Sequence, residues 1–401
     1  MENRRRILHG LKTPITIRLY NYDPYILNYF ILLILAYLYW KKPDPKLVKW
    51  AFFLEFVFIA FRAPVVGADT WNYVRYLDGE RNFYNYDPRP LEAGFVIYRQ
   101  VLLALHPNRF VVMLVNSFLS CYPLYLIIKR YSNNVPLTLA MLSIFNFYYV
   151  YFCGLRQILG FAILLMGLIY VLDEKKKKWL VFVLCAALGY SFHTTIVVYA
   201  AIFLAAYFLR FKSRTILISS VVISAVFGIV LQSFNIMDAF NFFLSMNFEA
   251  TERIENYMQD NSDVNEITSI FMSLRPTIIA VFIYALMDKE KLNHWFSVIY
   301  ALGVIIGNLF ISVPMINRLT GCFVIFGVVA FSWMLGNNYL SSFKQRRITN
   351  FVLVIFLLYF SQMYVKNNMD SVIDLTSSAR MHPYQFIWED YSNHPSIKYF
   401  K

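Results

Sequence analysis

Long apolar runs alternate along this chain with short loops rich in lysine and arginine. About 20 consecutive apolar residues in a helix are enough to cross the roughly 30 Å hydrocarbon core of a bilayer. The chain of 401 residues is 59% hydrophobic and only 15% charged, which is too few polar residues for the surface of a soluble protein of this size. We therefore expect an all-α fold, namely a polytopic integral membrane protein.

The net charge of +13 has a topological explanation. The lysines and arginines gather in the loops between apolar runs, where they orient a membrane protein and attract anionic lipid. This placement excludes nucleic acid as a partner. The four cysteines are scattered singly, without the C-x-x-C spacing of a metal or redox pair. We expect no metal and no cofactor.

The basic loops also predict the topology. Such loops are expected on the cytoplasmic side, so an even number of crossings must separate each neighbouring pair. About twelve spans satisfy this count, at Tyr25–Trp40, Val48–Phe61, Phe110–Ile128, Pro136–Phe152, Ile158–Leu172, Trp179–Phe192, Thr194–Leu209, Thr215–Leu231, Phe271–Met287, Trp295–Ser312, Leu319–Leu335 and Phe351–Val365. The apolar segment near 91–106 breaks the count if it crosses, so we expect a re-entrant or interfacial helix there.

Three regions follow from this map. Residues 1–24 form a basic N-terminal extension, and the side of the membrane on which it lies stays open. Residues 25–365 form the polytopic domain, with outer loops at 62–109 and 232–270, and residues 366–401 form a tail on the outer face. The second outer loop is acidic and aromatic, which suits either a solvated helical loop or a lid.

The first outer loop contains a carboxylate followed by aromatic residues. Asp69 follows a glycine and precedes a helical pattern, so it suits an ordinary helix cap. Alternatively, Asp69 presents its carboxylate to a sugar hydroxyl, while Trp71, Tyr73 and Tyr76 stack on sugar rings. Both interpretations remain open at this stage.

Several arginines are predicted at span boundaries. Arg156 and Gln157 open one span and Arg318 opens another, while Arg275 lies just inside a third and precedes a proline. Such arginines either snorkel to lipid phosphates or hold a phosphate at a helix N-terminus. Charges at a membrane boundary indicate a functional site by default. Several cations on one side suit a pyrophosphate better than a carboxylate.

His193 lies in a tight turn, Tyr190 to Thr195, between two apolar runs. A histidine there is often a hydrogen-bonded cap, because the neighbouring hydroxyl groups supply its partners. It also suits a general base or a proton donor to a phosphate near neutral pH. The same count that places the arginines outside places His193 with them.

The order of these motifs resembles a known family. The motifs are R-x-x-x-x-G-x-D-x-x-x-Y from Arg62, E-x-G-F from Glu92, R-Q at Arg156, S-F-H-T around His193 and N-R at Arg318. Together they are similar to the EpsG-type family of Wzy-like bacterial polysaccharide polymerases, from about Leu47 to the C-terminus. The basic extension is longer than expected, and Thr194 stands where a second His or Ser is common, which leaves the partner of His193 open.

The resemblance implies a polymerase of the bacterial inner membrane whose active site faces the periplasm or exterior. Its substrate would be an undecaprenyl-pyrophosphate-linked oligosaccharide, polymerised into capsule, exopolysaccharide or O-antigen by transfer to a sugar hydroxyl. Chain-length regulator and flippase proteins are implied partners, beside membrane lipid. The enzyme would need to neutralise the departing pyrophosphate and deprotonate the acceptor.

The candidate residues divide between these tasks. The pyrophosphate and substrate would be bound by Arg62, Arg156, Gln157, Arg275, Arg318, Trp71, Tyr73, Tyr76 and Glu92. His193 or Asp69 would act as the base, and we favour His193 because its ordinary pKa lies nearer neutral pH. Two alternatives are a metal-dependent lipid-phosphate glycosyltransferase using Asp78 and Glu80, and a flippase or transporter without chemistry.

Overall fold

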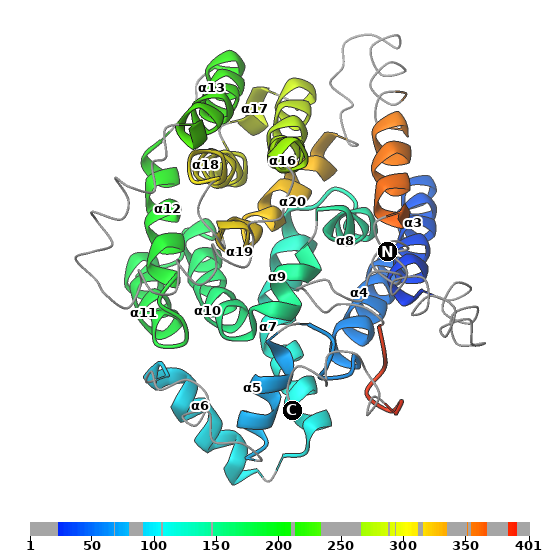
Figure 1. Cartoon of the computed structure of the whole chain (residues 1–401), viewed down its shortest axis with the longest axis vertical. Coiled ribbons are helices and arrows are strands. Elements are labelled where there is room, and N and C mark those ends of the chain that lie inside the picture. Colours follow the sequence, from blue (N-terminus) through cyan, green and yellow to red (C-terminus); the bar gives the residue numbers. More distant parts are fainter. Residues whose placement is uncertain are drawn as a thin grey trace, which may run out of the picture. The chain divides into compact units, whose positions relative to one another are not determined.

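The computed structural model describes most of the chain, and the described part is helical, with turns and one isolated β-bridge between Arg62 and Phe386 (Figure 1). The described residues are 23–67, 69–79, 91–105, 107–145, 147–209, 213–233, 266–287, 289–292, 294–311, 316–334, 351, 354–366 and 384–390. Most of the N-terminal extension, of the acidic loop and of the C-terminal tail lies outside these ranges, as does Glu80.

Four helices of the described part are long and apolar enough to cross a membrane: α3 (Pro24–Lys41), α7 (Arg109–Tyr131), α10 (Leu155–Leu172) and the window Arg214–Leu231 of α13 (Arg214–Ser233). Shorter apolar helices are α6 (Ala93–Ala104), α8 (Val135–Ile144), α11 (Lys178–Tyr190), α12 (Ile196–Phe208), Leu274–Leu286 in α16 (Glu266–Leu286), α18 (Trp295–Leu309), α20 (Val324–Met334) and Val354–Lys366. The helical class is confirmed, and the number of crossings stays a prediction.

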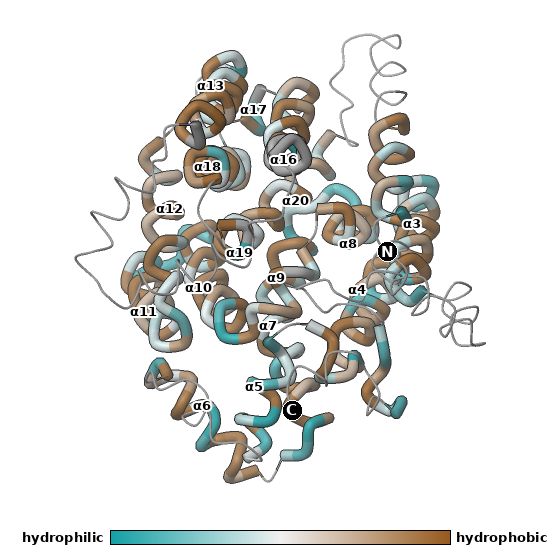
Figure 2. The backbone as a smooth tube through the Cα atoms, viewed as in Figure 1, coloured by the Kyte–Doolittle hydropathy of each residue, from teal (hydrophilic) through white to brown (hydrophobic). Residues whose placement is uncertain are grey.

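Exposed apolar side chains lie along these helices at helical spacing. On α11 they are Leu180, Val183, Leu184 and Leu188, and on α13 they include Ile216, Ile223, Phe227 and Val230. Large exposed apolar stripes of this kind are unfavourable in water and suit contact with lipid. Figure 2 shows the same property, since hydrophobic colour dominates the helices.

Most predicted runs coincide with single helices, but two do not. The run Pro136–Phe152 is divided between α8 and α9 (Phe147–Cys153), and Leu319–Leu335 between α19 (Ile316–Gly321) and α20. Asparagine and aromatic residues at the first break, and Gly321 at the second, have lower helix propensity than leucine or alanine. Hydropathy alone does not register such breaks.

Close contacts divide the chain into two compact units. The first comprises Met1–Ile196 and Asn350–Lys401, and the second Val197–Thr349. In the first unit α10 packs on α11 and α7, while α3, α4 (Pro45–Ala60) and α8 pack together (Figure 1). The α10–α11 contact depends on glycines, because a Cβ on Gly167 would lie 2.8 Å from the Cβ of Cys185. Small residues let membrane helices approach this closely.

Glu55 lies within the first unit, on α4, and has polar partners. Asn28 of α3 donates to its carboxylate at 3.1 Å, and the Tyr148 hydroxyl of α9 donates to it at 2.8 Å. Glu55 is only 4% exposed. A buried carboxylate is costly without such hydrogen bonds, so this cluster ties three helices together.

A neutral polar cluster plays the same part in the second unit. Asn308 of α18 donates to Ser224 of α13 at 2.9 Å and to Thr277 of α16 at 2.8 Å. Interhelical hydrogen bonds of this type hold helices together in lipid, where no water competes for the groups. The short helix α17 (Lys289–Leu292) and helix α20 also pack against α18.

Candidate functional site

The α10–α11 hairpin brings Arg156 and His193 to the same end of the first unit. The backbones of Gly160 and Gly189 approach so closely that a Cβ on either would lie 2.7 Å from the other's carbonyl oxygen. Arg156 precedes Gly160 by four residues and His193 follows Gly189 by four. Because the helices are antiparallel, both lie about one turn, ~6 Å, beyond this contact.

Gly67 holds the loop that begins at Arg62 against the end of α9. It has a φ of 104°, and a Cβ there would lie 2.5 Å from the carbonyl oxygen of Phe152. The Thr70 hydroxyl donates to the same carbonyl oxygen. The loop is therefore fixed one residue before Cys153, where the chain turns into α10, and α5 (Thr70–Leu77) begins there.

Gly94 holds the start of α6 against the turn that contains His193. Its N–H donates to the Ser191 carbonyl oxygen at 2.8 Å, and a Cβ at Gly94 would lie 2.1 Å from the Ser191 hydroxyl oxygen. The Tyr98 and Phe192 rings add a contact, with centroids 6.0 Å apart. The glycine of the E-x-G-F motif thus serves a close approach of two backbones.

Arg156, Tyr73 and Glu92 meet where these segments converge. Arg156 lies in the first turn of α10; its Nε donates to the Tyr73 hydroxyl at 3.0 Å and its Nη1 donates to Glu92 in an ion pair. The guanidinium also lies 5.1 Å from the Tyr73 ring centroid. Burial raises the pKa of Tyr73, although the charge of Arg156 works against this shift. Three predicted site residues are therefore in direct contact.

Asp69 stands at the N-cap position of α5 but does not cap it. Its side chain makes no capping hydrogen bond there, so the cap interpretation does not describe the carboxylate. Its charge acts instead on the Tyr73 hydroxyl, because it helps raise the pKa of Tyr73. Asp69 therefore adds a second acidic group near Arg156, beside Glu92.

His193 is held in one orientation by the turn into α12. Its Nδ1 accepts a hydrogen bond from the Thr195 N–H at 3.3 Å and lies 2.8 Å from the Thr195 hydroxyl oxygen. An Nδ1 that accepts from a backbone N–H leaves the proton of the neutral ring on Nε2. His294 accepts from the Phe296 N–H in the same way at the start of α18. The cap interpretation of His193 is therefore correct, and it also sets the tautomer.

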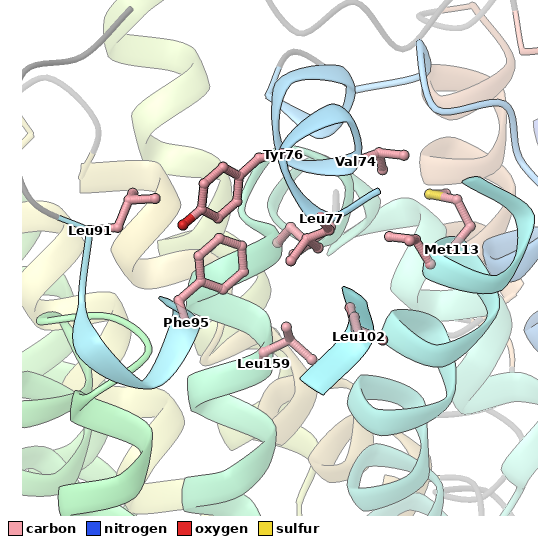
Figure 3. Close-up of a cluster of buried hydrophobic side chains, with 10 residues drawn as sticks. Val74, Tyr76, Leu77, Leu91, Phe95, Leu102, Met113 and Leu159 are labelled. Carbon is pink, nitrogen blue, oxygen red and sulfur yellow. The ribbon is translucent and has the colours of Figure 1, made fainter. Parts of the chain in front are cut away.

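The predicted sugar-stacking aromatics are packed against protein groups. Trp71 is 8% exposed, and the Arg109 guanidinium lies 4.8 Å from its ring centroid. Tyr76 is 2% exposed and stacks on Phe95, while Arg99 lies over its ring at 4.4 Å. Figure 3 shows Tyr76 and Phe95 in the apolar cluster that joins α5, α6, α7 and α10. In this arrangement Trp71 and Tyr76 stabilise the loop, and their contact with sugar stays a prediction.

Arg62 and Gln157 are buried in the first unit. Arg62 is 2% exposed; its Nη1 donates to the Ile59 carbonyl oxygen at 2.7 Å, and its guanidinium lies 4.2 Å from the Phe152 ring centroid. Burial lowers the pKa of Arg62. Gln157 is 5% exposed, next to Arg156. Arg62 also lines a small cavity with residues of α7, α9 and α10.

The remaining predicted arginines belong to the second unit. Arg318 is the third residue of the six-residue helix α19 and falls in its last turn, whereas the sequence predicted it at the start of a long span. Arg275 lies well inside α16, because that helix begins at Glu266 rather than near Phe271, where the apolar run starts. Both are partly exposed. The convergence of Arg275 and Arg318 with Arg156 stays a prediction.

Sequence reasoning overlooked two groups of residues. Arg99 and Arg109 hold α5 and α6 in place through Tyr76 and Trp71. A hydropathy pattern does not predict such contacts between arginine and aromatic side chains. A polar stripe on α7, formed by Asn116, Ser117 and Ser120, lines the cavity at Arg62. The sequence could have indicated this stripe, because its three polar residues recur on one side of a predicted membrane span.

A comparison with protein-family models supports the resemblance inferred from the order of the motifs. The model of the EpsG family matches residues 46–386. Neither a curated protein nor a solved structure matches the chain. The family match includes every motif described above and covers most of the sequence. The chain therefore belongs to the EpsG family, a Wzy-like polysaccharide polymerase family.

Proposed function

We propose that this protein joins undecaprenyl-pyrophosphate-linked oligosaccharide repeat units into a surface polysaccharide at the outer face of the inner membrane. The acceptor hydroxyl oxygen bonds to the anomeric carbon of the growing chain, and the bond from that carbon to the pyrophosphate breaks. The pyrophosphate leaves with the electron pair, and the hydroxyl proton passes to a base. The contact of Arg156, Tyr73 and Glu92 beside the His193 turn is the observation that carries this proposal.

Arg156 is the group proposed to bind the leaving pyrophosphate. A guanidinium carries five N–H donors in a rigid plane, and Tyr73 and Glu92 take one from Nε and one from Nη1. These two bonds fix the plane and leave other N–H groups for phosphoryl oxygens. The first turn of α10 adds the positive end of a helix dipole. Glu92 therefore acts as a positioning residue.

His193 and Asp69 are proposed to have different roles in the transfer. Since Thr195 holds Nδ1 as an acceptor, the neutral ring of His193 is suited to donate a hydrogen bond from Nε2, without losing its proton, to an oxygen of the departing pyrophosphate. The sequence favoured His193 as the base, and this hydrogen bonding supports the donor role instead. Asp69, whose charge acts on the Tyr73 hydroxyl beside Arg156, is the proposed base for the acceptor hydroxyl.

The metal-dependent alternative depended on Asp78 and Glu80. Asp78 lies 3.1 Å from Arg109 Nε in an ion pair, so this carboxylate already neutralises a cation that holds Trp71. Glu80 lies outside the described residues. We therefore propose fixed arginines, rather than a metal ion, as the groups that neutralise the leaving group.

Arg156→Lys should lower polymer formation by about ten- to a hundredfold, because lysine keeps the charge but loses the planar fork. The measurement is polymerisation of purified lipid-linked repeat units by reconstituted protein. Arg99→Lys is the matched control: Arg99 also donates through Nε, to the Tyr76 carbonyl oxygen, and lies over an aromatic ring. Equal losses in the two variants, or none in Arg156→Lys, would show that Arg156 has only a packing role.

His193→Gln should keep activity within about tenfold of the unchanged protein, whereas His193→Ala, which removes the hydrogen-bond donor to the leaving group, should lose on the order of a hundredfold. The glutamine amide can donate near the position of Nε2 but cannot accept a proton. Asp69→Asn should lose a similar factor to His193→Ala, because the base is removed. An inactive His193→Gln beside an active Asp69→Asn would reverse the two roles.

The proposed orientation is tested by labelling single added cysteines with a membrane-impermeant thiol reagent. Asn72→Cys should be labelled in intact cells whose outer barrier has been removed, while Lys176→Cys should be labelled only after permeabilisation. The unaltered chain sets the background from its four native cysteines. The opposite pattern would place the Arg156 site on the cytoplasmic side and refute the proposal.

A further inference from the structure

A small cavity lies beside the Arg156 site, and we call it the α7 cavity. It is lined by Arg62, Met113, Asn116, Ser117, Ser120, Tyr151, Leu155, Ile158 and Leu159. Its volume is about 10 Å³, which is room for roughly one water-sized group. Leu155 directly precedes Arg156, so the cavity borders the first turn of α10.

Two buried N–H donors in the wall of the α7 cavity have no hydrogen-bond partner among the described residues. They are Arg62 Nε and Asn116 Nδ2. Arg62 is 2% exposed and Asn116 is 5% exposed. An unsatisfied buried donor costs about 1–3 kcal/mol, and more when the group is charged. Native proteins rarely leave two such groups side by side.

The orientation of the Asn116 amide is set by Tyr98. The Tyr98 hydroxyl donates to Asn116 Oδ1 at 2.5 Å, which occupies the acceptor side of the amide. The Nδ2 side is therefore the one that remains for the cavity. Asn116 contributes a donor there, and rotation of the amide would break the bond to Tyr98.

The hydroxyl groups of Ser120 and Tyr151 in the cavity are already paired. Ser120 Oγ donates to the Asn116 carbonyl oxygen at 2.6 Å, and the Tyr151 hydroxyl bonds to Ser120 Oγ. Tyr151 also lies 3.1 Å from the Cys121 sulfur. The unmet hydrogen bonds thus lie at Arg62 and Asn116, and both require an acceptor.

The charge of Arg62 favours a negative acceptor. The titratable groups that act on it most are Tyr151, Tyr384, Tyr25 and Cys153, and none of these is a carboxylate. A buried cation without a counter-charge is strongly unfavourable. A neutral water molecule would satisfy the donors but would leave the charge uncompensated.

We propose that the α7 cavity binds one anionic oxygen of the substrate's diphosphate, which accepts hydrogen bonds from Arg62 Nε and Asn116 Nδ2. The cavity holds a single oxygen, so the rest of the diphosphate lies outside it, toward the first turn of α10. The identity of this anion rests on the proposed function. Asn116 is thereby a substrate-binding residue, with Tyr98 as its positioning residue.

The test is binding of farnesyl diphosphate to the full-length protein in detergent micelles, measured as ligand-dependent thermal stabilisation. Asn116→Asp replaces the donor with a carboxylate that pairs with Arg62 and competes with the ligand. Its affinity for farnesyl diphosphate should fall at least tenfold. If the diphosphate alone is recognised, the affinity of Asn116→Asp for inorganic pyrophosphate should fall by a similar factor. If only the affinity for farnesyl diphosphate falls, the prenyl chain is needed to bring the diphosphate to the cavity.

The matched control is Asn134→Asp, the same change at a buried asparagine of the first unit that lies outside the cavity and bonds to the Ala36 carbonyl oxygen. Its affinity should be unchanged. If Asn116→Asp fails to fold, Tyr98→Phe removes only the bond that orients the amide and should weaken binding several-fold. Unchanged affinity in the Asn116 and Tyr98 variants would mean that the cavity holds water only.

Two further comparisons separate this inference from the proposed function. An equal loss of farnesol binding in Asn116→Asp would show a disturbed prenyl site and would overturn the inference. Weaker binding in Arg156→Lys together with normal binding in Asn116→Asp would refute the α7 cavity site but support the proposed function. If the protein binds farnesyl diphosphate through Asn116 yet makes no polymer, the α7 cavity site would be supported and the proposed function refuted.

Discussion

Close backbone contacts at four glycines position everything else in the candidate site. Gly160 and Gly189 bring α10 and α11 together, Gly94 meets Ser191, and Gly67 meets the Phe152 carbonyl oxygen. A side chain at any of them would push apart segments that are distant in sequence. Because the contacts lie at one end of the α10–α11 hairpin, Arg156, Glu92 and His193 gather there. The four glycines, of which Gly67 and Gly94 belong to the motifs, thus serve the site indirectly by permitting its assembly.

Arginine has two different uses around this site. Arg99 and Arg109 lie over aromatic rings and bond to Tyr76 and Asp78, so their positive charge serves to hold α5 and α6 in place. Arg156 is fixed by two bonds but keeps further donors, and Arg62 is buried with an unsatisfied Nε. Arg156 and Arg62 therefore have N–H groups that can donate hydrogen bonds to the anionic oxygens of a bound ligand.

The sequence predicts the helices well and the contacts poorly, for physical reasons. Apolar runs report which segments avoid water, so α7, α10 and α18 follow from hydropathy, and the position of Arg156 in the first turn of α10 follows with them. Breaks such as the one between α8 and α9 depend on local propensity. The pairing of Arg156 with Glu92, and the role of Asn116, depend on which helices meet, which no periodicity records. The tautomer of His193 depends on a single backbone N–H in the turn.

We propose that this member of the EpsG family polymerises lipid-linked repeat units, and the lipid-linked glycans of the cell test this proposal most directly. Their mass spectrum would be recorded in a strain that lacks the protein and in the same strain with the protein restored. We expect single, unpolymerised repeat units on the lipid in the first strain and long chains in the second. Long chains in the absence of the protein, or no accumulation of single units on the lipid, would contradict this proposal.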